Sequence, residues 1–263
     1  MWRLGACPLI SSRWGAMSDQ DKSVASRIAY WLRDRLSAPL FDSIDVNGCD
    51  VLDVGGGSFF LRLRERRQEW RRYVVIEPSD DLLPDPDPSV EGMIGTAQDL
   101  PFPDESFDRV LAVQVLEHVF EPIKATDEMY RCLRPGGELV ILVPQSGNLH
   151  LVPYHFQNFT RFWLFEQAKR MGAEITLWKP LGGAWRTIAS RLFLLFWPLL
   201  DLHETRDPVL RHRPWHYWLL LPFQVTAAVI FFPIALLLSV SDISEEANNH
   251  LVVMRKPVAS EPA

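Results

Sequence analysis

The sequence predicts a doubly wound α/β fold on a mostly parallel sheet, and two short stretches carry this prediction. The first is an apolar run that ends in Asp53 and leads directly into Gly55, Gly56 and Gly57. Glycine permits a tight strand-to-helix turn and lets a ligand approach the main chain closely. The second is the apolar run 73–76, which ends in Glu77. An acid there can accept both hydroxyls of a ribose, so the unit is typical of a nucleoside-binding half-sheet.

Length and composition set the class of protein. The chain has 263 residues, of which 48% are apolar, which suffices for one large domain or one domain with an insertion. A net charge of −6 without a basic block argues against nucleic acid as the main partner. Cys7, Cys49 and Cys132 form no C-x-x-C pair, so they suit a reducing, cytoplasmic setting and neither a disulfide framework nor a metal site.

The N-terminal segment 1–17 is expected to be poorly ordered. Its apolar patch is too short for a secretory signal, which leaves open an organellar transit peptide or an upstream start with Met17 as the usual initiator. Residues 19–36 carry apolar side chains at helical spacing, so a helix is expected there. The predicted domain then comprises 18–182 and 247–257, and 183–246 is an insertion.

The elements after the glycine turn follow from apolar runs and breakers. A helix is expected over 61–72; its many arginines favour a solvated face, with an anionic membrane surface as the alternative. Prolines break the chain before a third strand at 90–94. The fourth strand, 107–115, is apolar enough to be buried on both faces. Its carboxyl end delivers Gln114, Glu117 and His118 to the edge of the sheet where ligands bind.

The second half of the sheet is predicted in the same way. A helix at 123–133 ends at a Pro-Gly-Gly turn, and the fifth strand follows at 138–144. A further helix, 160–171, precedes the sixth strand at 174–178. Residues 248–257 have the pattern of a seventh strand.

Several motifs occur in one order along the chain: Asp53-x-Gly55-x-Gly57, Glu77, and the segments 99–104, 106–108, 116–119 and 133–138. As a set they resemble the class I S-adenosylmethionine-dependent methyltransferases, of the small-molecule, Methyltransferase domain 11 type with a Leu-Glu-His segment. The resemblance spans about Val51 to Lys179, with a last strand near 250–256. It implies a Rossmann-like, seven-stranded sheet whose antiparallel last strand lies between the fifth and sixth. One departure is Phe59, which stands where the family pattern has its third glycine.

The resemblance implies S-adenosylmethionine as cofactor and no metal. The glycine turn would hold the methionine part, Asp53 its ammonium and Glu77 the ribose. Asp99 would accept from the adenine amine, beside backbone near Leu100. The full set of candidate cofactor-binding residues is Asp53, Gly55, Gly56, Gly57, Glu77, Pro78, Gln98, Asp99, Leu100 and Gln114.

The acceptor chemistry stays open at this point. Methyl transfer to a hydroxyl needs a general base within hydrogen-bond reach. His118 and His155 are the candidates, with Tyr154 as the orienting residue; in the family an aromatic, polar loop such as 154–162 faces the substrate. Methyl transfer to an activated carbon needs no strong base, and the histidines would then only shape the pocket or tie the fourth strand to its loop.

The insertion contains two apolar stretches, 192–200 and 217–240, and the second has no charged residue and the length to cross a bilayer. Because the chain must return to the same sheet, an odd number of crossings is excluded. Three arrangements remain: a helical hairpin with 188–200 as its first arm, a re-entrant or interfacial helix broken at Pro222 and Pro233, or a buried dimer contact.

Basic and aromatic residues in the insertion favour a membrane. Candidate contacts to headgroups and to the interface are Arg206, Arg211, His212 and Arg213, with Trp185, Trp197, Trp215 and Trp218. The sequence thus predicts methyl transfer to a small or lipid-like acceptor at a membrane surface, by a cytoplasmic protein attached through 188–240. The alternatives are a non-catalytic S-adenosylmethionine-binding scaffold recruited to a membrane, and a soluble enzyme whose insertion forms a dimer. The oligomeric state is left open.

Overall fold

The computed structural model describes residues 40–147, 149, 151, 153–200 and 215–258, with the side chains of 193–200 excluded. The predictions for 1–17, for the helix at 19–36 and for the basic residues 206–213 lie outside the described residues. The strands are β1 (Asp50–Val54), β2 (Arg72–Glu77), β3 (Glu91–Ile94), β4 (Phe107–Val113), β5 (Leu133–Pro144), β6 (Glu174–Leu181) and β7 (Asn249–Arg255). The helices are α2 (Phe59–Glu65), α3 (Pro122–Arg131), α4 (Arg161–Met171), α5 (Ala184–Leu200) and α6 (Trp215–Leu238).

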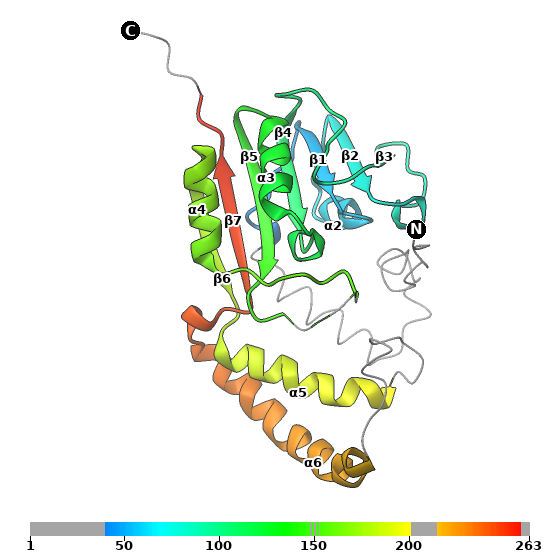
Figure 1. The fold of residues 1–263 in the computed structure, drawn as a ribbon, viewed down its shortest axis with the longest axis vertical. Coiled ribbons are helices and arrows are strands. Elements are labelled where there is room, and N and C mark those ends of the chain that lie inside the picture. Colours follow the sequence, from blue (N-terminus) through cyan, green and yellow to red (C-terminus); the bar gives the residue numbers. More distant parts are fainter. Residues whose placement is uncertain (1–39, 148, 150, 152, 201–214, 259–263) are drawn as a thin grey trace.

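The strands form one seven-stranded sheet in the order β3-β2-β1-β4-β5-β7-β6 (Figure 1). Neighbouring strands from β3 to β5 pair in parallel, and β7 pairs antiparallel with both β5 and β6. The predicted α/β fold class and the antiparallel seventh strand between the fifth and sixth are therefore confirmed. The carboxyl ends of β1, β2, β4 and β5 consequently meet at one edge of the sheet.

The core has two layers, because the central strands are buried on both faces. Leu52 and Val54 of β1 pack into the layer that contains Met129 of α3 and Leu164 of α4. Val51 packs into the other layer, which contains Leu63 of α2. Since side chains alternate along a strand, Asp53 points to the same face as Val51.

The predicted helix over 61–72 is wrong in its length. Helix α2 ends at Glu65, and Arg67 has the left-handed φ of 60°. Beyond this turn the chain is held by tertiary bonds, because the Gln68 side chain accepts from Val46 N at 3.0 Å and donates to Ile44 O at 3.2 Å. Phe59, in place of the third glycine, begins the helix and stacks on Phe41 with a centroid distance of 5.4 Å.

Most arginines of 62–72 do lie on a solvated face, as predicted, because Arg64, Arg67, Arg71 and Arg72 are exposed. Arg62 is buried, Arg64 donates to Asp87 and Arg72 donates to Glu91. Other boundaries shift by less. Strand β4 ends at Val113 because Gln114 takes a φ of 58°, and β5 begins at Leu133, running through the Pro-Gly-Gly turn.

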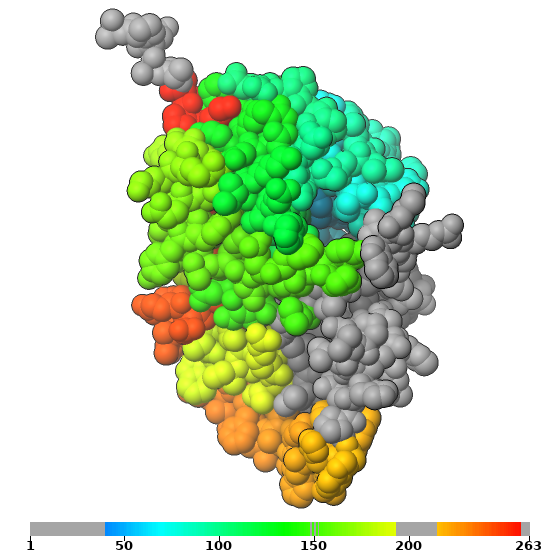
Figure 2. Space-filling view, viewed as in Figure 1, coloured from blue at the N-terminus to red at the C-terminus, as the bar shows by residue number. Residues whose placement is uncertain are grey.

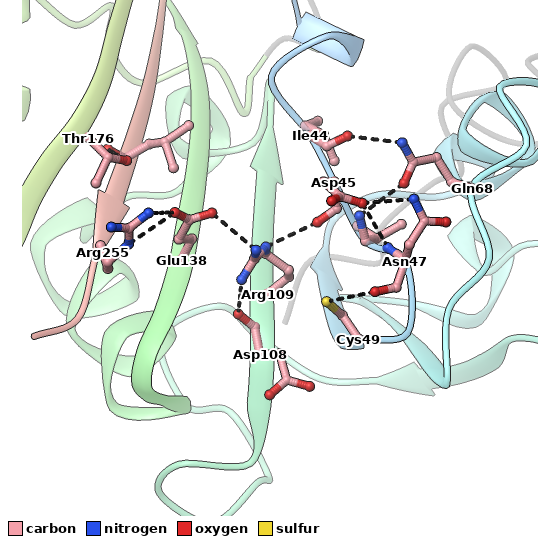
Figure 3. A network of polar contacts seen from close by, with 12 residues as sticks. Ile44, Asp45, Asn47, Cys49, Gln68, Asp108, Arg109, Glu138, Thr176 and Arg255 are labelled. Carbon is pink, nitrogen blue, oxygen red and sulfur yellow. Dashed lines mark hydrogen bonds and ion pairs between the residues drawn. The ribbon is translucent and has the colours of Figure 1, made fainter. Parts of the chain in front are cut away.

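A network of ion pairs and hydrogen bonds lies at the amino-terminal ends of the parallel strands, which we call the amino-terminal edge of the sheet (Figure 3). Arg109 of β4 donates to Asp45 O at 3.1 Å and lies 3.3 Å from the carboxylate of Glu138, which also pairs with Arg255 of β7 at 2.7 Å. Nearby, Arg71 bridges Asp50 at 2.7 Å and Asp108 at 2.9 Å. These contacts connect β1, β4, β5 and β7 at the edge opposite the glycine turn.

The insertion forms an antiparallel pair of helices, α5 and α6, beyond the carboxyl ends of the strands (Figure 1), and we call this pair the hairpin. Its base is closed by a bond from Asn248 N to Leu181 O at 3.1 Å. The Asp242 carboxylate caps α5, accepting from Trp185 N at 2.8 Å and Arg186 N at 3.1 Å. The pair has the shape of the predicted helical hairpin, and α5 begins at Ala184, before the predicted start of the first arm at 188.

Helix α6 runs without a break through Pro222 and Pro233, so the predicted interruptions are wrong. Each proline removes only one helical hydrogen bond, and the remaining bonds keep the helix continuous. The buried side chains of α6 are Ala228 and Ala235, and α5 buries Ala189. Large apolar residues of α6 are exposed, and the hairpin forms one end of the molecule (Figure 2).

Candidate active site

The glycine turn between β1 and α2 has no room for side chains. Gly55 and Gly57 have left-handed φ values of 68° and 47°. A Cβ on Gly55 would lie 2.8 Å from Val115 Cγ2, and one on Gly56 would collide with the Asp53 carboxylate. The turn therefore presents bare backbone at the carboxyl edge of the sheet, which is what close approach of a ligand requires.

Glu77 lies directly at this turn. Gly57 N donates to Glu77 Oε1 at 2.7 Å, and the Glu77 side chain is buried. Burial raises the pKa of Glu77 to about 7, the Asp53 charge adds to the rise, and the Gly57 amide opposes it. The glycine turn and the acid that ends β2 thus lie side by side, and their joint role as a cofactor cradle stays a prediction.

Asp53 lies beneath the same turn and is completely buried. Its Oδ2 accepts from the Tyr73 hydroxyl at 2.6 Å, whereas Oδ1 has no hydrogen-bond partner within the described part of the chain. Burial raises the pKa of Asp53 to about 7, although the Tyr73 bond lowers it. A buried carboxylate oxygen without a donor suits an incoming ammonium group.

The loop after β3 is attached to this cradle. Gly95 N donates to Glu77 O at 2.8 Å, and Asp99 N donates to Thr96 O at 3.2 Å. Asp99 is exposed, and Gln98 is half-buried. Leu100 is buried, and its amide already donates to Glu128 at 3.0 Å, so that amide is engaged within the protein. Of the predicted residues, Asp99 is thus the one in this loop with an accessible carboxylate.

Two predicted residues lie at the margin of the cradle. Pro78 follows Glu77 and is exposed. Gln114 ends β4 with its amide bonded to Leu142 O at 2.8 Å, and its side chain donates to Asn249 Oδ1 at 3.0 Å. The Gln114 side chain therefore reaches toward the start of β7.

The predicted catalytic residues come together after β4. His118 Nδ1 donates to the backbone oxygen of Tyr154 at 2.9 Å, because a carbonyl can only accept. The other ring nitrogen, His118 Nε2, lies 3.8 Å from Glu117 Oε1. Tyr154 orients His118 through its main chain, while its side chain is 45% exposed.

His155 takes the opposite tautomer. Its Nε2 lies 3.0 Å from Asn158 Oδ1 and donates to it, and its ring meets the His118 ring edge-on at a centroid distance of 5.6 Å. The loop is fastened to the segment after β4 by a bond from Phe156 N to Glu117 O at 2.8 Å. Two regions far apart in sequence thus build one histidine pair.

Glu117, which the sequence placed at this edge of the sheet without assigning it a role, lies beside His118. Its side chain is fully buried, and burial raises its pKa to about 7. The available signal was an acid next to His118, just beyond the apolar fourth strand. Among the described residues, no group of three or more His, Cys, Asp or Glu side chains could hold a metal ion.

Residues 52–141 match the family described as "Methyltransferase domain". An uncharacterized methyltransferase of Mycobacterium sp. (strain KMS) is 34% identical over 132 residues, which are 49% of this chain and 48% of that protein. The 2-methyl-6-phytyl-1,4-hydroquinone methyltransferase 2, chloroplastic, of Oryza sativa subsp. japonica is 28% identical over 156 residues, 51% of this chain and 42% of that protein. The chain thus spans about half the length, 48%, of the relatives it matches first.

Among solved structures, the [4+2]-cyclase SpnF superposes with a TM-score of 0.53 at 22% identity. The match covers 92% of this chain and 86% of that one. A likeness at this identity supports the fold alone.

Proposed function

We propose that this chain, a class I S-adenosylmethionine-dependent methyltransferase by its domain and fold, transfers the methyl group to a small, lipid-like acceptor at the surface of a membrane. The observation that carries the proposal is the 2.7 Å bond from Gly57 N to Glu77 Oε1, which joins the bare backbone turn to a buried acceptor of hydroxyl groups. Fold alone would not assign the activity.

The residues present fit S-adenosylmethionine, whose sulfonium activates the methyl carbon. The backbone of Gly55 to Gly57 would hold the methionine part, and the unsatisfied Asp53 Oδ1 its ammonium. Glu77 would accept from the ribose hydroxyls and the exposed Asp99 from the adenine amine. Gly56, Pro78, Gln98, Leu100 and Gln114 complete the proposed lining.

His118 is the proposed general base for a hydroxyl acceptor. Its Nδ1 is engaged by the Tyr154 carbonyl, so Nε2 is the atom that takes the acceptor proton. The Glu117 side chain lies 3.8 Å from this nitrogen. His155 packs against this ring and shapes the acceptor side.

The hairpin supports a membrane as the partner. Helix α6 has 24 residues and so is about 36 Å long, enough to cross a hydrocarbon layer of about 30 Å. Among the described side chains of α5 and α6, the buried ones are Ala189, Ala228 and Ala235, whereas Trp215 is 76% and Phe223 72% exposed, which is the reverse of a water-soluble helix pair. The 27-residue apolar helix 215–241 has only 11% of its most apolar window buried, unlike the core helix of a soluble protein.

A calorimetric titration tests the cofactor half of the proposal. Wild-type protein is expected to bind S-adenosylmethionine, and a labelled-methyl assay on a total lipid extract is expected to label a lipid-soluble product. Binding without any labelled product, from lipids or from soluble metabolites, would favour the scaffold alternative. Absence of binding would remove the proposed enzyme altogether.

Vesicle flotation tests the membrane half. The wild-type protein should float with vesicles of phosphatidylcholine and phosphatidylglycerol, and Phe223→Asp should weaken this, because a charge then enters the apolar layer. Phe162→Asp is the matched control, since Phe162 is also 64% exposed but lies on α4. Recovery as a detergent-free soluble dimer would instead assign the exposed face of α6 to a second copy of the chain.

A further inference from the structure

A continuous set of hydrogen bonds connects the hairpin to the histidine pair. On α5, Arg191 donates to Ser146 O at 2.9 Å and to Gly147 O at 3.4 Å. Asn158 Nδ2 donates to the same Gly147 O at 3.2 Å, and Asn158 Oδ1 accepts from His155 Nε2 at 3.0 Å. His155 then packs edge-on against His118.

Residues 145–147, which we call the junction, are where these parts meet. Gln145 N and Ser146 N both donate to Asn248 O, at the point where the hairpin returns to the sheet. A Cβ on Gly147 would lie 2.7 Å from Pro144 Cβ and 3.3 Å from Asn158 Oδ1. The junction is thus packed closely against the loop 154–162, which we call the acceptor loop. Phe159 N fixes that loop to Pro144 O at 2.8 Å.

We propose that Arg191 and Asn158 are positioning residues that hold the acceptor side of the site through the junction, so that seating of the hairpin sets the orientation of His155 and His118. The role in methyl transfer rests on the function proposed above. Neither residue needs to touch the acceptor: Arg191 fixes the Gly147 carbonyl, and Asn158 passes that position to the His155 ring.

The hydrogen-bond partners along this path fix the tautomers of His155 and His118. Asn158 satisfies Gly147 O with its amide nitrogen, which leaves Oδ1 as the acceptor and forces His155 into the tautomer protonated at Nε2. The Tyr154 carbonyl forces His118 into the tautomer protonated at Nδ1. Loss of Arg191 should release the junction, and the two histidines should then exchange between tautomers.

The first test reads the tautomers and not the activity. In full-length protein labelled with ¹⁵N-histidine in lipid nanodiscs, wild-type spectra should show His118 protonated at Nδ1 and His155 at Nε2. Arg191→Ala should average the His155 signals and shift those of His118, and Arg191→Lys should restore them in part. Arg186→Ala is the matched control, because Arg186 lies on the same helix and no hydrogen bond of its side chain to the junction is found in the described residues. Unchanged histidine signals in Arg191→Ala would overturn the proposal.

The second test uses the reaction. Arg191→Ala should lower kcat on a total lipid extract by about 10- to 100-fold, because a misplaced catalytic side chain costs about this much. Cofactor affinity should stay as in the wild type, and Asn158→Ala should add little to Arg191→Ala if both act on one path. If kcat is unchanged, or if the two losses in kcat add in full, the proposed path from Arg191 through Gly147 O and Asn158 to His155 is wrong. If Arg191→Ala alters the histidine tautomers but the wild-type protein transfers no methyl group, the positioning role stands and the proposed function is wrong.

Discussion

Acidic side chains at the two edges of the sheet lie in opposite electrostatic environments. At the amino-terminal edge, the bond from Arg71, with a second from Arg134, holds the pKa of Asp50 below its ordinary value. Burial would raise the pKa of Asp108, but bonds from Asp50 N and Arg134 outweigh it and lower that pKa. At the carboxyl edge, burial dominates and the pKa values of Asp53, Glu77 and Glu117 rise to about 7.

This difference in pKa separates carboxylates that hold the strands together, at the amino edge, from carboxylates proposed to bind a ligand, at the carboxyl edge. The amino-edge carboxylates accept from guanidinium groups, whereas Asp53 and Glu77, within the described part of the chain, accept from a neutral hydroxyl and a neutral amide. A buried carboxyl with few donors destabilises the folded state when it ionises. The fold keeps such groups where a cationic, hydroxyl-rich cofactor would supply the missing donors.

The largest expected effect is on stability as a function of pH. Asp53, Glu77 and Glu117 have folded pKa values near 7 and ordinary values of 3.8, 4.5 and 4.5. Between about pH 4.5 and 7 the folded state therefore binds more protons than the unfolded state. The free energy of unfolding should fall as pH rises through this window, by up to about 1.4 kcal/mol per pH unit for each extra proton.

Urea denaturation at pH 5, 6 and 7 without cofactor measures this slope. Burial lowers the pKa of His250, so this residue makes the free energy of unfolding rise with pH, but it is one group against three carboxyls. Glu117→Gln should make the slope shallower, because one of the three buried carboxyls no longer ionises. A free energy of unfolding that is flat or rises over this window would contradict the contrast between the edges.

The next effect is on cofactor binding at the carboxyl edge. Glu77→Ala should weaken S-adenosylmethionine binding about 100-fold, since it removes a charged acceptor whose hydrogen bonds are each worth about 1.5–3 kcal/mol. The same change should lower the free energy of unfolding at pH 7 only slightly, because removal of a buried carboxyl offsets the loss of the acceptor of the Gly57 amide. Calorimetry and urea denaturation of the same preparation separate the two. A loss of stability with unchanged affinity would reverse the roles assigned to the edges.

The strands could be located from the sequence, because the apolar runs and the glycine turn are local signals, and the place of the seventh strand in the sheet came from the family resemblance. The end of α2 could not. Arginine is a good helix former, so 66–72 has helical character, but the turn at Arg67 and the bonds of Gln68 to 44–46 decide the backbone there. Those partners lie outside any sequence window.

The closeness of Gly57 and Glu77 was predictable, because Gly57 lies in the turn after β1 and Glu77 ends β2, which is the adjacent parallel strand. The acceptor side was predictable only in part. The sequence named His118, His155 and Tyr154, but it could not show that Tyr154 acts through its backbone oxygen or that Glu117 is fully buried. Arg191 and Asn158 act through the Gly147 carbonyl, and main-chain contacts leave no residue pattern to read.

A smaller effect is expected at the amino edge. Asp108 accepts from Asp50 N at 2.8 Å, from Arg71 at 2.9 Å and from Arg134 at 2.8 Å. Asp108→Ala should lower the free energy of unfolding by about 2 kcal/mol, because it leaves a backbone donor and two cations without their acceptor. Cofactor affinity should not change. A weaker affinity in this variant would mean that the edges are coupled and not separate.

The smallest effect is expected at Asp99, which is on the carboxyl edge but exposed. Water competes for an exposed carboxylate, so Asp99→Ala should weaken S-adenosylmethionine binding only about two- to fivefold, the low end for one hydrogen bond. The loss should vanish for an analogue with hydrogen in place of the adenine amine, because that analogue offers Asp99 no donor. Calorimetry with both ligands on wild-type and variant protein measures the four affinities that this comparison needs. An equal loss for both ligands would show that Asp99 supports the loop through its own backbone turn and does not recognise the amine.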